Sequence, residues 1–144
     1  MNRTIVKFGY PDGVVADYEH WVVLLRPQQP TLGALVLAAK SDAEAFADLS
    51  PAAFAELGTV VADIETALKA AVAYDRINYL MLMMVDPHVH FHVLPRYDGS
   101  QAACGIDVPD AGWPKVPDLG AAVAVSSAQT IALIAWLREH WPSA

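Results

Sequence analysis

Three histidines stand at alternate positions in the sequence HVHFHV, residues 88–93, and the residues between them are apolar. Successive side chains of a β-strand point to opposite faces, so a strand would place His88, His90 and His92 on one face. An α-helix would scatter residues at this spacing around its circumference. The run therefore predicts a strand with a row of imidazoles on one face, about 7 Å apart along the chain.

The runs on either side of these histidines predict other strands of a sheet. Residues 18–27 (YEHWVVLLRP) and 33–40 (GALVLAAK) are apolar and rich in β-branched residues, and a Pro-containing turn separates them. Residues 76–85 (RINYLMLMMV) are apolar on both faces. Asp86 followed by Pro87 interrupts regular structure, because a residue before proline avoids the helical region. We therefore expect this run and the histidine run to be two strands joined by a tight turn.

Two helices are predicted from their start signals and their periodicity. Ser50 followed by Pro51 is typical of a helix start, and apolar residues then recur at intervals of three and four as far as Val72. Ser126 and Gln129 have the spacing of a capping box and indicate a C-terminal helix. Strands, helix, strands and helix in this order predict an α+β domain with an antiparallel sheet.

The length of 144 residues predicts one domain over residues 1–144. Its motif-bearing core is expected at about residues 20–97. An irregular segment rich in Gly, Pro and Asp is expected over residues 98–125, and the C-terminal helix completes the part from 98–144. The formal charge of -7 comes without a cluster of basic residues. This argues against a protein that coats nucleic acid.

Cysteine content and hydropathy bear on the compartment. The chain has one cysteine, which excludes an internal disulfide and fits a reducing compartment. Residues 1–13 are interrupted by Lys7 and Asp12 and contain no signal-peptide core. Residues 119–137 carry no charge, but polar residues interrupt their middle. We therefore expect a cytoplasmic protein without a membrane partner.

Three interpretations of the histidine row are open from the residues alone. Neutral imidazole is a nucleophile that can attack phosphorus while a neighbouring group holds its tautomer. Alternate histidines on a strand can also coordinate zinc together with a ligand from elsewhere. The third interpretation is a set of solvent-facing polar residues on a half-exposed sheet, which three imidazoles with only apolar residues between them disfavour.

The sequence HVHFHVL, residues 88–94, resembles the signature of the histidine triad (HIT) family. Upstream, WVVLLRPQQPTLGALVL resembles that family's strand, turn and strand, and the long helix from Ser50 lies where the family has one. The resemblance covers about residues 20–97 and is greatest to small bacterial members described as diadenosine-tetraphosphate-hydrolase-like. It implies a HIT-like fold with about five antiparallel strands, one long helix and a C-terminal helix.

The same resemblance implies a homodimer in which two five-stranded sheets join. The predicted strand with the sequence LMLMMV, residues 80–85, and the apolar C-terminal helix suit such an interface. Either of them is equally compatible with burial inside one subunit.

The resemblance also implies an activity. Family members hydrolyse or transfer nucleoside monophosphates at the α-phosphorus, with no metal or other cofactor required, although bound zinc or magnesium stays open. By motif position His90 is the nucleophile that forms a nucleotidyl-histidine intermediate, His92 binds phosphate oxygens or the leaving group, and His88 supports the site by positioning and electrostatics. Activity is then expected to fall as pH drops through the apparent pKa of the triad, because the nucleophile must be neutral.

The sequence departs from the family pattern at two places. Ala34 stands where many members carry a fourth histidine, and VDP precedes the triad where many carry a Gly-Gln-Ser or Gly-Gln-Thr run. Asp86 is the ionisable residue beside the triad that is a candidate to protonate a leaving group, with a plain turn aspartate as the alternative. These departures leave the leaving-group preference open.

Three further residues are candidates for binding substrate. Arg26 and Arg96 are placed near strand ends where a guanidinium group can bind phosphate oxygens, with surface arginine as the alternative interpretation. Asn78 begins the strand before the triad and is a candidate for a ribose or phosphate contact. The function predicted is a nucleotidyl hydrolase or transferase for a dinucleoside polyphosphate or nucleoside phosphoramidate. The alternatives are a nucleotide-binding protein with little turnover and a zinc-binding module that uses the three histidines.

Overall fold

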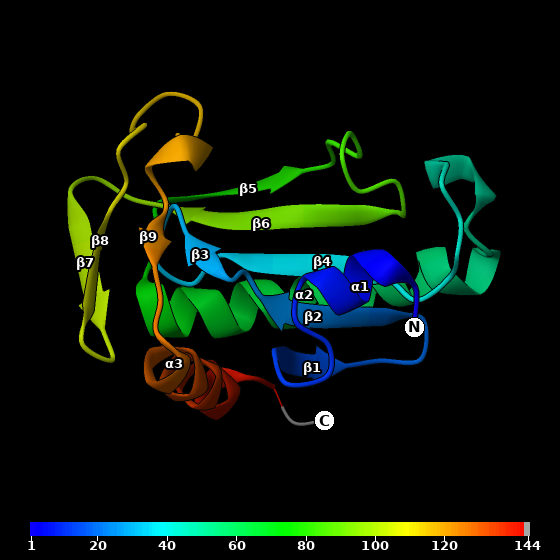
Figure 1. The fold of residues 1–144 in the computed structure, drawn as a ribbon, viewed down its shortest axis with the longest axis horizontal. Helices are drawn as coiled ribbons and strands as arrows, with labels where there is room; N and C mark the ends of the chain where they lie inside the picture. The colour runs from blue at the N-terminus through cyan, green and yellow to red at the C-terminus, as the bar shows by residue number, and fades with distance from the viewer. Residues whose placement is uncertain (143–144) are drawn as a thin grey trace.

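A five-stranded antiparallel sheet forms the centre of the computed structural model, which describes residues 1–142 (Figure 1). The strand order is β1-β2-β4-β6-β5, so β6 is an inner strand and β5 lies at an edge. The predicted α+β class with about five antiparallel strands is confirmed. The last two residues of the predicted domain, 143–144, lie outside the described part of the chain. The strands of this sheet are β1 Val14–Asp17, β2 Trp21–Leu25, β4 Leu35–Ala39, β5 Arg76–Leu80 and β6 His90–Arg96.

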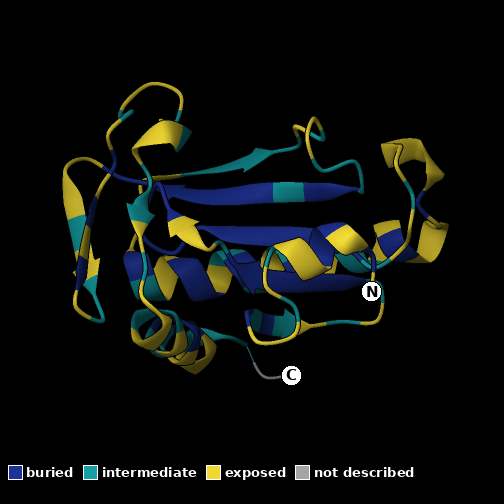
Figure 2. Ribbon diagram, in the orientation of Figure 1, coloured by how far each residue is buried: buried dark blue, intermediate teal, exposed yellow. Residues whose placement is uncertain are grey.

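Both faces of the sheet centre are covered, which explains why the inner strands are apolar without interruption. All residues of β2 and β4 are buried, as Figure 2 shows. The long helix α2, Pro51–Val72, covers one face, and the short helix α1, Arg3–Lys7, crosses the other (Figure 1). Ile5 of α1 packs against the alternate residues Val22, Leu24, Val36 and Ala38. Each face of the sheet therefore belongs to a separate hydrophobic core.

Local signals account for the helices. Ser50 caps α2 by accepting a hydrogen bond from the Ala53 amide, and the predicted end of this helix at Val72 is confirmed. Helix α3, Ser127–His140, begins with the predicted capping box of Ser126 and Gln129. It packs on α2 and β1 within the subunit, and its buried residues are Leu133, Ile134 and Leu137.

The segment from 98–125 is more regular than predicted. It contains a β-hairpin of β7, Ser100–Ala103, and β8, Ile106–Pro109. The turn between them holds Cys104 and Gly105 at φ +53° and +79°, which is the tight hairpin turn with two left-handed residues. A Cys-Gly pair is a weak turn signal compared with Asn-Gly, so the hairpin was missed. Shorter elements complete the chain: β3 Gln28–Gln29, β9 Val123–Ala124, and the 3-10 helices η1 Phe46–Asp48 and η2 Leu119–Ala121.

The predicted strand over residues 76–85 is wrong in its second half. Strand β5 ends at Leu80, and the chain then forms a loop in which Met83 has the left-handed φ of +50°. Extended backbone cannot continue through such a residue. Met84 and Val85 are exposed at 86% and 84% of their surface. The apolar residues of this stretch are therefore not a sign that it is buried in a sheet. Among the helices of residues 1–142, none is long and apolar enough to cross a membrane.

Candidate active site

Two of the three histidines lie side by side on strand β6. Residues His90 and His92 face the same side of the sheet as Ala38 and Val36, with which they pair on β4. Their rings are 5.2 Å apart between centroids and meet edge to face. The prediction that all three histidines belong to one strand is wrong, because β6 begins at His90 and His88 lies in the bend before it. The spacing of the two rings is shorter than the expected strand repeat because the side chains lean together.

The imidazole of His90 is held in one tautomer by the backbone. Its Nδ1 atom lies 2.7 Å from the carbonyl oxygen of His88. A carbonyl oxygen only accepts, so Nδ1 carries the proton and the lone pair of a neutral ring lies on Nε2. His90 is 2% exposed and lines a pocket on this face of the sheet. This arrangement presents an unprotonated ring nitrogen to the pocket, as a nucleophile requires.

His92 is neutral over the physiological pH range. Burial first, and then the charges of Arg26 and His90, together lower the pKa of His92 to about 4, with Asp86 acting in the opposite direction. The side chain is 8% exposed by residue, and its Nδ1 atom has no hydrogen-bond partner within residues 1–142. A buried polar atom without a partner is costly. His92 lines the same pocket as His90.

The lowered pKa of His92 predicts a loss of stability in mild acid. The unfolded chain binds a proton near pH 6.5 and the folded chain only near pH 4, so the free energy of unfolding should fall as pH drops between these values. The loss is on the order of 3 kcal/mol, from 1.36 kcal/mol for each of about 2.5 pKa units. Urea unfolding at several pH values measures it for the native protein and for His92→Gln. Parallel pH curves for the two proteins would contradict the assignment.

The pocket beside the two histidines has a volume of about 340 Å³. It is built from five separate parts of the chain: the end of α1, the residue after β2, the loop between β5 and β6, β6 itself, and η2. The ring of Phe8 lies 5.7 Å from the rings of both His90 and His92. The lining residues are Lys7, Phe8, Arg26, Leu82, Met83, Met84, Val85, Asp86, His90, His92 and Leu119.

Arg26 brings a positive charge to this pocket, and the buried side-chain amide of Gln29 sets the position of Arg26. The side chain of Gln29 donates to the carbonyl oxygens of Arg26 and Ala34 at 2.8 and 3.0 Å and accepts from the Gly33 and Ala34 amides. The Nη1 atom of Arg26 donates to the Gln28 carbonyl, while Nε is buried with no partner in the described chain. Burial also lowers the pKa of Arg26. Arg26 thus lines the pocket with one hydrogen bond from its guanidinium group within the described chain.

Asp86 lies at the pocket but does not have a free carboxylate. Both of its oxygens accept from Lys7 Nζ, at 2.8 and 3.0 Å. This ion pair joins the end of α1 to the loop before β6. The prediction that Asp86 serves as an acid for the leaving group is therefore less favourable than the sequence suggested, because both of its carboxylate oxygens are engaged by Lys7.

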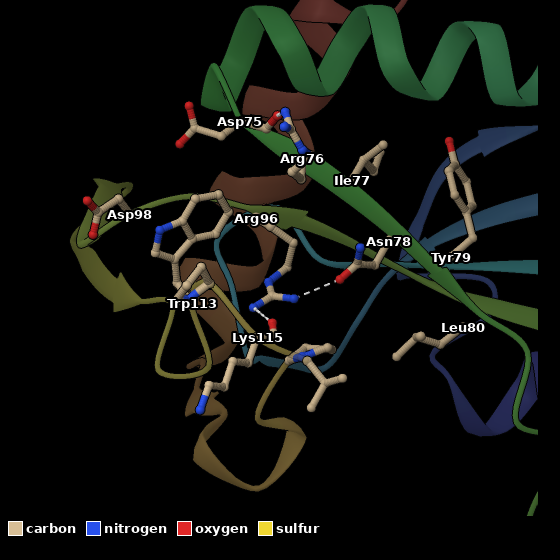
Figure 3. Close-up of a pocket in the computed structure, with 13 residues that line it drawn as sticks. Asp75, Arg76, Ile77, Asn78, Tyr79, Leu80, Arg96, Asp98, Trp113 and Lys115 are labelled. Carbon is tan, nitrogen blue, oxygen red and sulfur yellow. Dashed lines mark hydrogen bonds between the residues drawn. The ribbon is translucent and has the colours of Figure 1, made fainter.

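Arg96 and Asn78 do not line this pocket. Arg96 follows His92 by four strand residues, about 13 Å along β6, and is 3% exposed. Its guanidinium group donates to both carboxylate oxygens of Asp110 at 2.7 and 3.0 Å. It also donates to Asn78 Oδ1 at 2.7 Å and to the Lys115 carbonyl at 2.8 Å (Figure 3). These two residues border a second, wider hollow of about 1080 Å³ beside β5. The prediction that they meet the substrate phosphate at the triad is corrected: they join a loop to the sheet.

The sequence did not reveal the N-terminal contribution to the site. Lys7 and Phe8 lie more than 75 residues before the triad and have no motif of their own, and Leu119 belongs to the segment predicted to be irregular. Within residues 1–142, no group of three or more His, Cys, Asp or Glu side chains is arranged to hold a metal ion. The zinc-binding module that uses all three histidines is therefore not supported by the geometry.

The fold and the histidine pair were compared with known proteins. A histidine triad protein from Bradyrhizobium japonicum is similar over 99% of this chain and 97% of its own, with 22% identity and a TM-score of 0.74. A histidine triad protein from Sinorhizobium meliloti is 21% identical, with 97% and 95% covered and a TM-score of 0.74.

A third structure, described as a hypothetical histidine triad nucleotide-binding protein from Sulfolobus tokodaii, is 22% identical over 89% of this chain and 82% of its own, with a TM-score of 0.66. Comparison with curated protein sequences gave no match. The family model of the HIT domain matches residues 9–99, which is more than half of the chain. The resemblance predicted from the histidine run is confirmed, and the chain belongs to the HIT domain family.

Proposed function

We propose that the protein is a nucleotidyl hydrolase or transferase that cleaves a dinucleoside polyphosphate or a nucleoside phosphoramidate at the α-phosphorus. The observation that carries the proposal is the hydrogen bond from His90 Nδ1 to the His88 carbonyl, which leaves Nε2 as the nucleophilic atom beside the pocket. Membership of the HIT domain family supports the same function. So does the description of the similar Sulfolobus tokodaii protein as nucleotide-binding.

The proposed reaction has two steps. In the first, the lone pair on His90 Nε2 forms a bond to the α-phosphorus, and the bond from phosphorus to the leaving group breaks with its electron pair. The His88 carbonyl stabilises the positive charge on the ring through the Nδ1 proton. In the second step, water attacks phosphorus and loses a proton to solvent, and the P–N bond breaks with its electron pair returning to His90 Nε2. The nucleoside monophosphate is released and His90 is again neutral.

Charge and shape of the pocket support a nucleotide as substrate. Arg26 supplies positive charge for phosphate oxygens, and neutral His92 can donate one hydrogen bond. Phe8 and the loop from 82–85 form an apolar wall that suits a nucleobase. The volume of about 340 Å³ falls within the range of small-molecule sites, about 300–1,000 Å³.

Brief mixing with diadenosine tetraphosphate tests the function. We expect release of AMP and, after rapid acid-free quenching, a mass increase of one adenylyl group on the peptide that contains His90. A panel that includes adenosine phosphoramidate would identify the preferred leaving group. The second candidate is a nucleotide-binding protein with little turnover, which the pairing of Asp86 with Lys7 favours because it occupies the carboxyl group near the triad. Binding of AMP without turnover across the panel would support that alternative.

Replacing Arg26 with methionine should lower kcat/KM by about 10- to 100-fold, because a charge-assisted hydrogen bond to phosphate is lost while the long apolar stem is kept. Steady-state AMP release measures this effect. Arg138→Met is a matched control, since Arg138 also donates to backbone carbonyls but lies on α3, away from the pocket. Equal kcat/KM in the two variants would show that Arg26 does not meet the phosphate.

A homodimer remains a prediction of the family resemblance. The open edge of β5, Arg76–Leu80, is the site we propose for joining the two sheets. The earlier candidates are less suitable, because residues 81–85 form a loop and α3 buries its apolar residues within the subunit. The molar mass from light scattering tests the assembly.

A further inference from the structure

We infer that Thr4 is a positioning residue for the nucleophile His90 and that it acts through His88. The inference rests on the function proposed above, in which His90 must be held in one tautomer. It assigns a role to the N-terminal helix α1, which lies across the face of the sheet that carries the histidines (Figure 1).

The first step of the argument is the contact between Thr4 and His88. Thr4 Oγ1 lies 2.8 Å from His88 Nδ1, and Thr4 is 1% exposed. This is the one side-chain hydrogen bond that the Thr4 hydroxyl makes within residues 1–142. It joins residues that are 84 positions apart. The His88 ring is therefore anchored by α1 and is not among the residues that line the pocket.

The second step is the contact between His88 and His90. The carbonyl oxygen of His88 accepts from His90 Nδ1 at 2.7 Å, and this bond sets which ring nitrogen of His90 carries the proton. A ring anchored by Thr4 restricts the backbone of the same residue. His88 lies in a bend outside β6, and the peptide group that it shares with Val89 is held on one side by the hydrogen bond from the Val89 amide to the Ala43 carbonyl at 3.2 Å. The Thr4 hydroxyl adds a restraint on the other side, at the His88 ring.

The third step is the rigidity of the helix that holds Thr4. Asn2 caps α1 by accepting from the Ile5 amide at 3.0 Å, and its side-chain amide donates to the Ala39 and Ser41 carbonyls at 3.1 and 2.9 Å. Ile5 is fully buried against β2 and β4. Residues before and after Thr4 in the sequence are thus both held against the sheet, and this fixes the position of the Thr4 hydroxyl. A precise anchor of this kind is what a positioning role requires.

Thr4→Val tests the inference, because it removes the hydroxyl and keeps the shape. Long-range ¹H–¹⁵N spectra of the imidazole rings should show His90 with only Nδ1 protonated in the native protein and a mixture of tautomers in Thr4→Val. We expect kcat for AMP release to fall about tenfold with KM within about twofold, since one neutral hydrogen bond is lost from the catalytic arrangement. Thr4→Ser should restore both the spectrum and kcat.

Thr31→Val is the matched control. Thr31 is also 1% exposed, but its hydroxyl is buried without a partner in the described chain and does not reach the triad. This variant should leave kcat and the His90 tautomer unchanged. If Thr4→Val does not fold, Thr4→Ala provides a second test of the same hydroxyl.

The two proposals can fail separately. A native-like His90 spectrum in folded Thr4→Val would overturn the positioning role, and so would a loss of kcat that Thr4→Ser does not restore. An absence of turnover in the native protein would overturn the proposed function, while the tautomer measurement would still decide the role of Thr4.

Discussion

Replacing His90 with glycine is expected to reduce AMP release by about 10⁴-fold or more, because the reaction loses its nucleophile. Added imidazole should restore part of the activity, since the pocket beside β6 has the volume to admit it. The adenylyl mass increase on the protein should disappear in His90→Gly even when imidazole restores turnover. Steady-state kinetics and mass spectrometry of the quenched protein measure these effects.

His90→Gln controls for packing, because it fills the buried position without a nucleophilic nitrogen. It should be as inactive as His90→Gly and should not respond to imidazole. Circular dichroism and urea unfolding establish that both variants fold. Native rates of AMP release in folded His90→Gln would overturn the proposed mechanism.

Replacing Asp110 with alanine should lower the free energy of unfolding by about 3–5 kcal/mol, which is the typical effect of removing one partner from a buried ion pair. The side chains of Arg96 and Asp110 are 4% and 1% exposed. Asp110 also accepts a hydrogen bond from the Tyr97 amide at 3.2 Å. Without it, the guanidinium group would be a buried charge with only neutral partners. Urea unfolding followed by fluorescence measures the change.

Two further variants show whether the charge or the packing is responsible. Asp98→Ala removes an exposed carboxylate from the same region and should change stability by less than about 0.5 kcal/mol. The double variant Arg96→Met with Asp110→Leu removes both charges and should recover much of the lost stability. A loss below about 1 kcal/mol in Asp110→Ala would mean that water or neighbouring groups compensate for Arg96.

Elements with a strong local pattern were predicted correctly. The two apolar runs became β2 and β4, and Ser50 and Ser126 cap the two longer helices as predicted. These features depend on neighbours within about one turn of helix or one pair of strand residues. The loop after Leu80 was not predicted, because its apolar residues resemble those of a buried strand. The left-handed backbone conformation of Met83 is not indicated by the residue types around it.

The site was predicted only in part. Alternation of histidine and apolar residues indicated that His90 and His92 share a face, and Arg26 lies at the same pocket. Arg96 was a misleading candidate, because an arginine near the triad in sequence lies beyond it along the strand and is engaged by Asp110. Nothing near Thr4 or Phe8 in sequence indicates that they contact the histidines.

The sequence alone determined the family, the sheet and the strand that carries His90 and His92, because periodicity and capping are properties of consecutive residues. Tertiary structure decided which groups surround these two histidines. It turned His88 away from the row to the Thr4 hydroxyl, brought Phe8 over two imidazoles and paired Lys7 with Asp86. These contacts join residues about 80 positions apart, and they exist only because α1 covers the histidine face of the sheet.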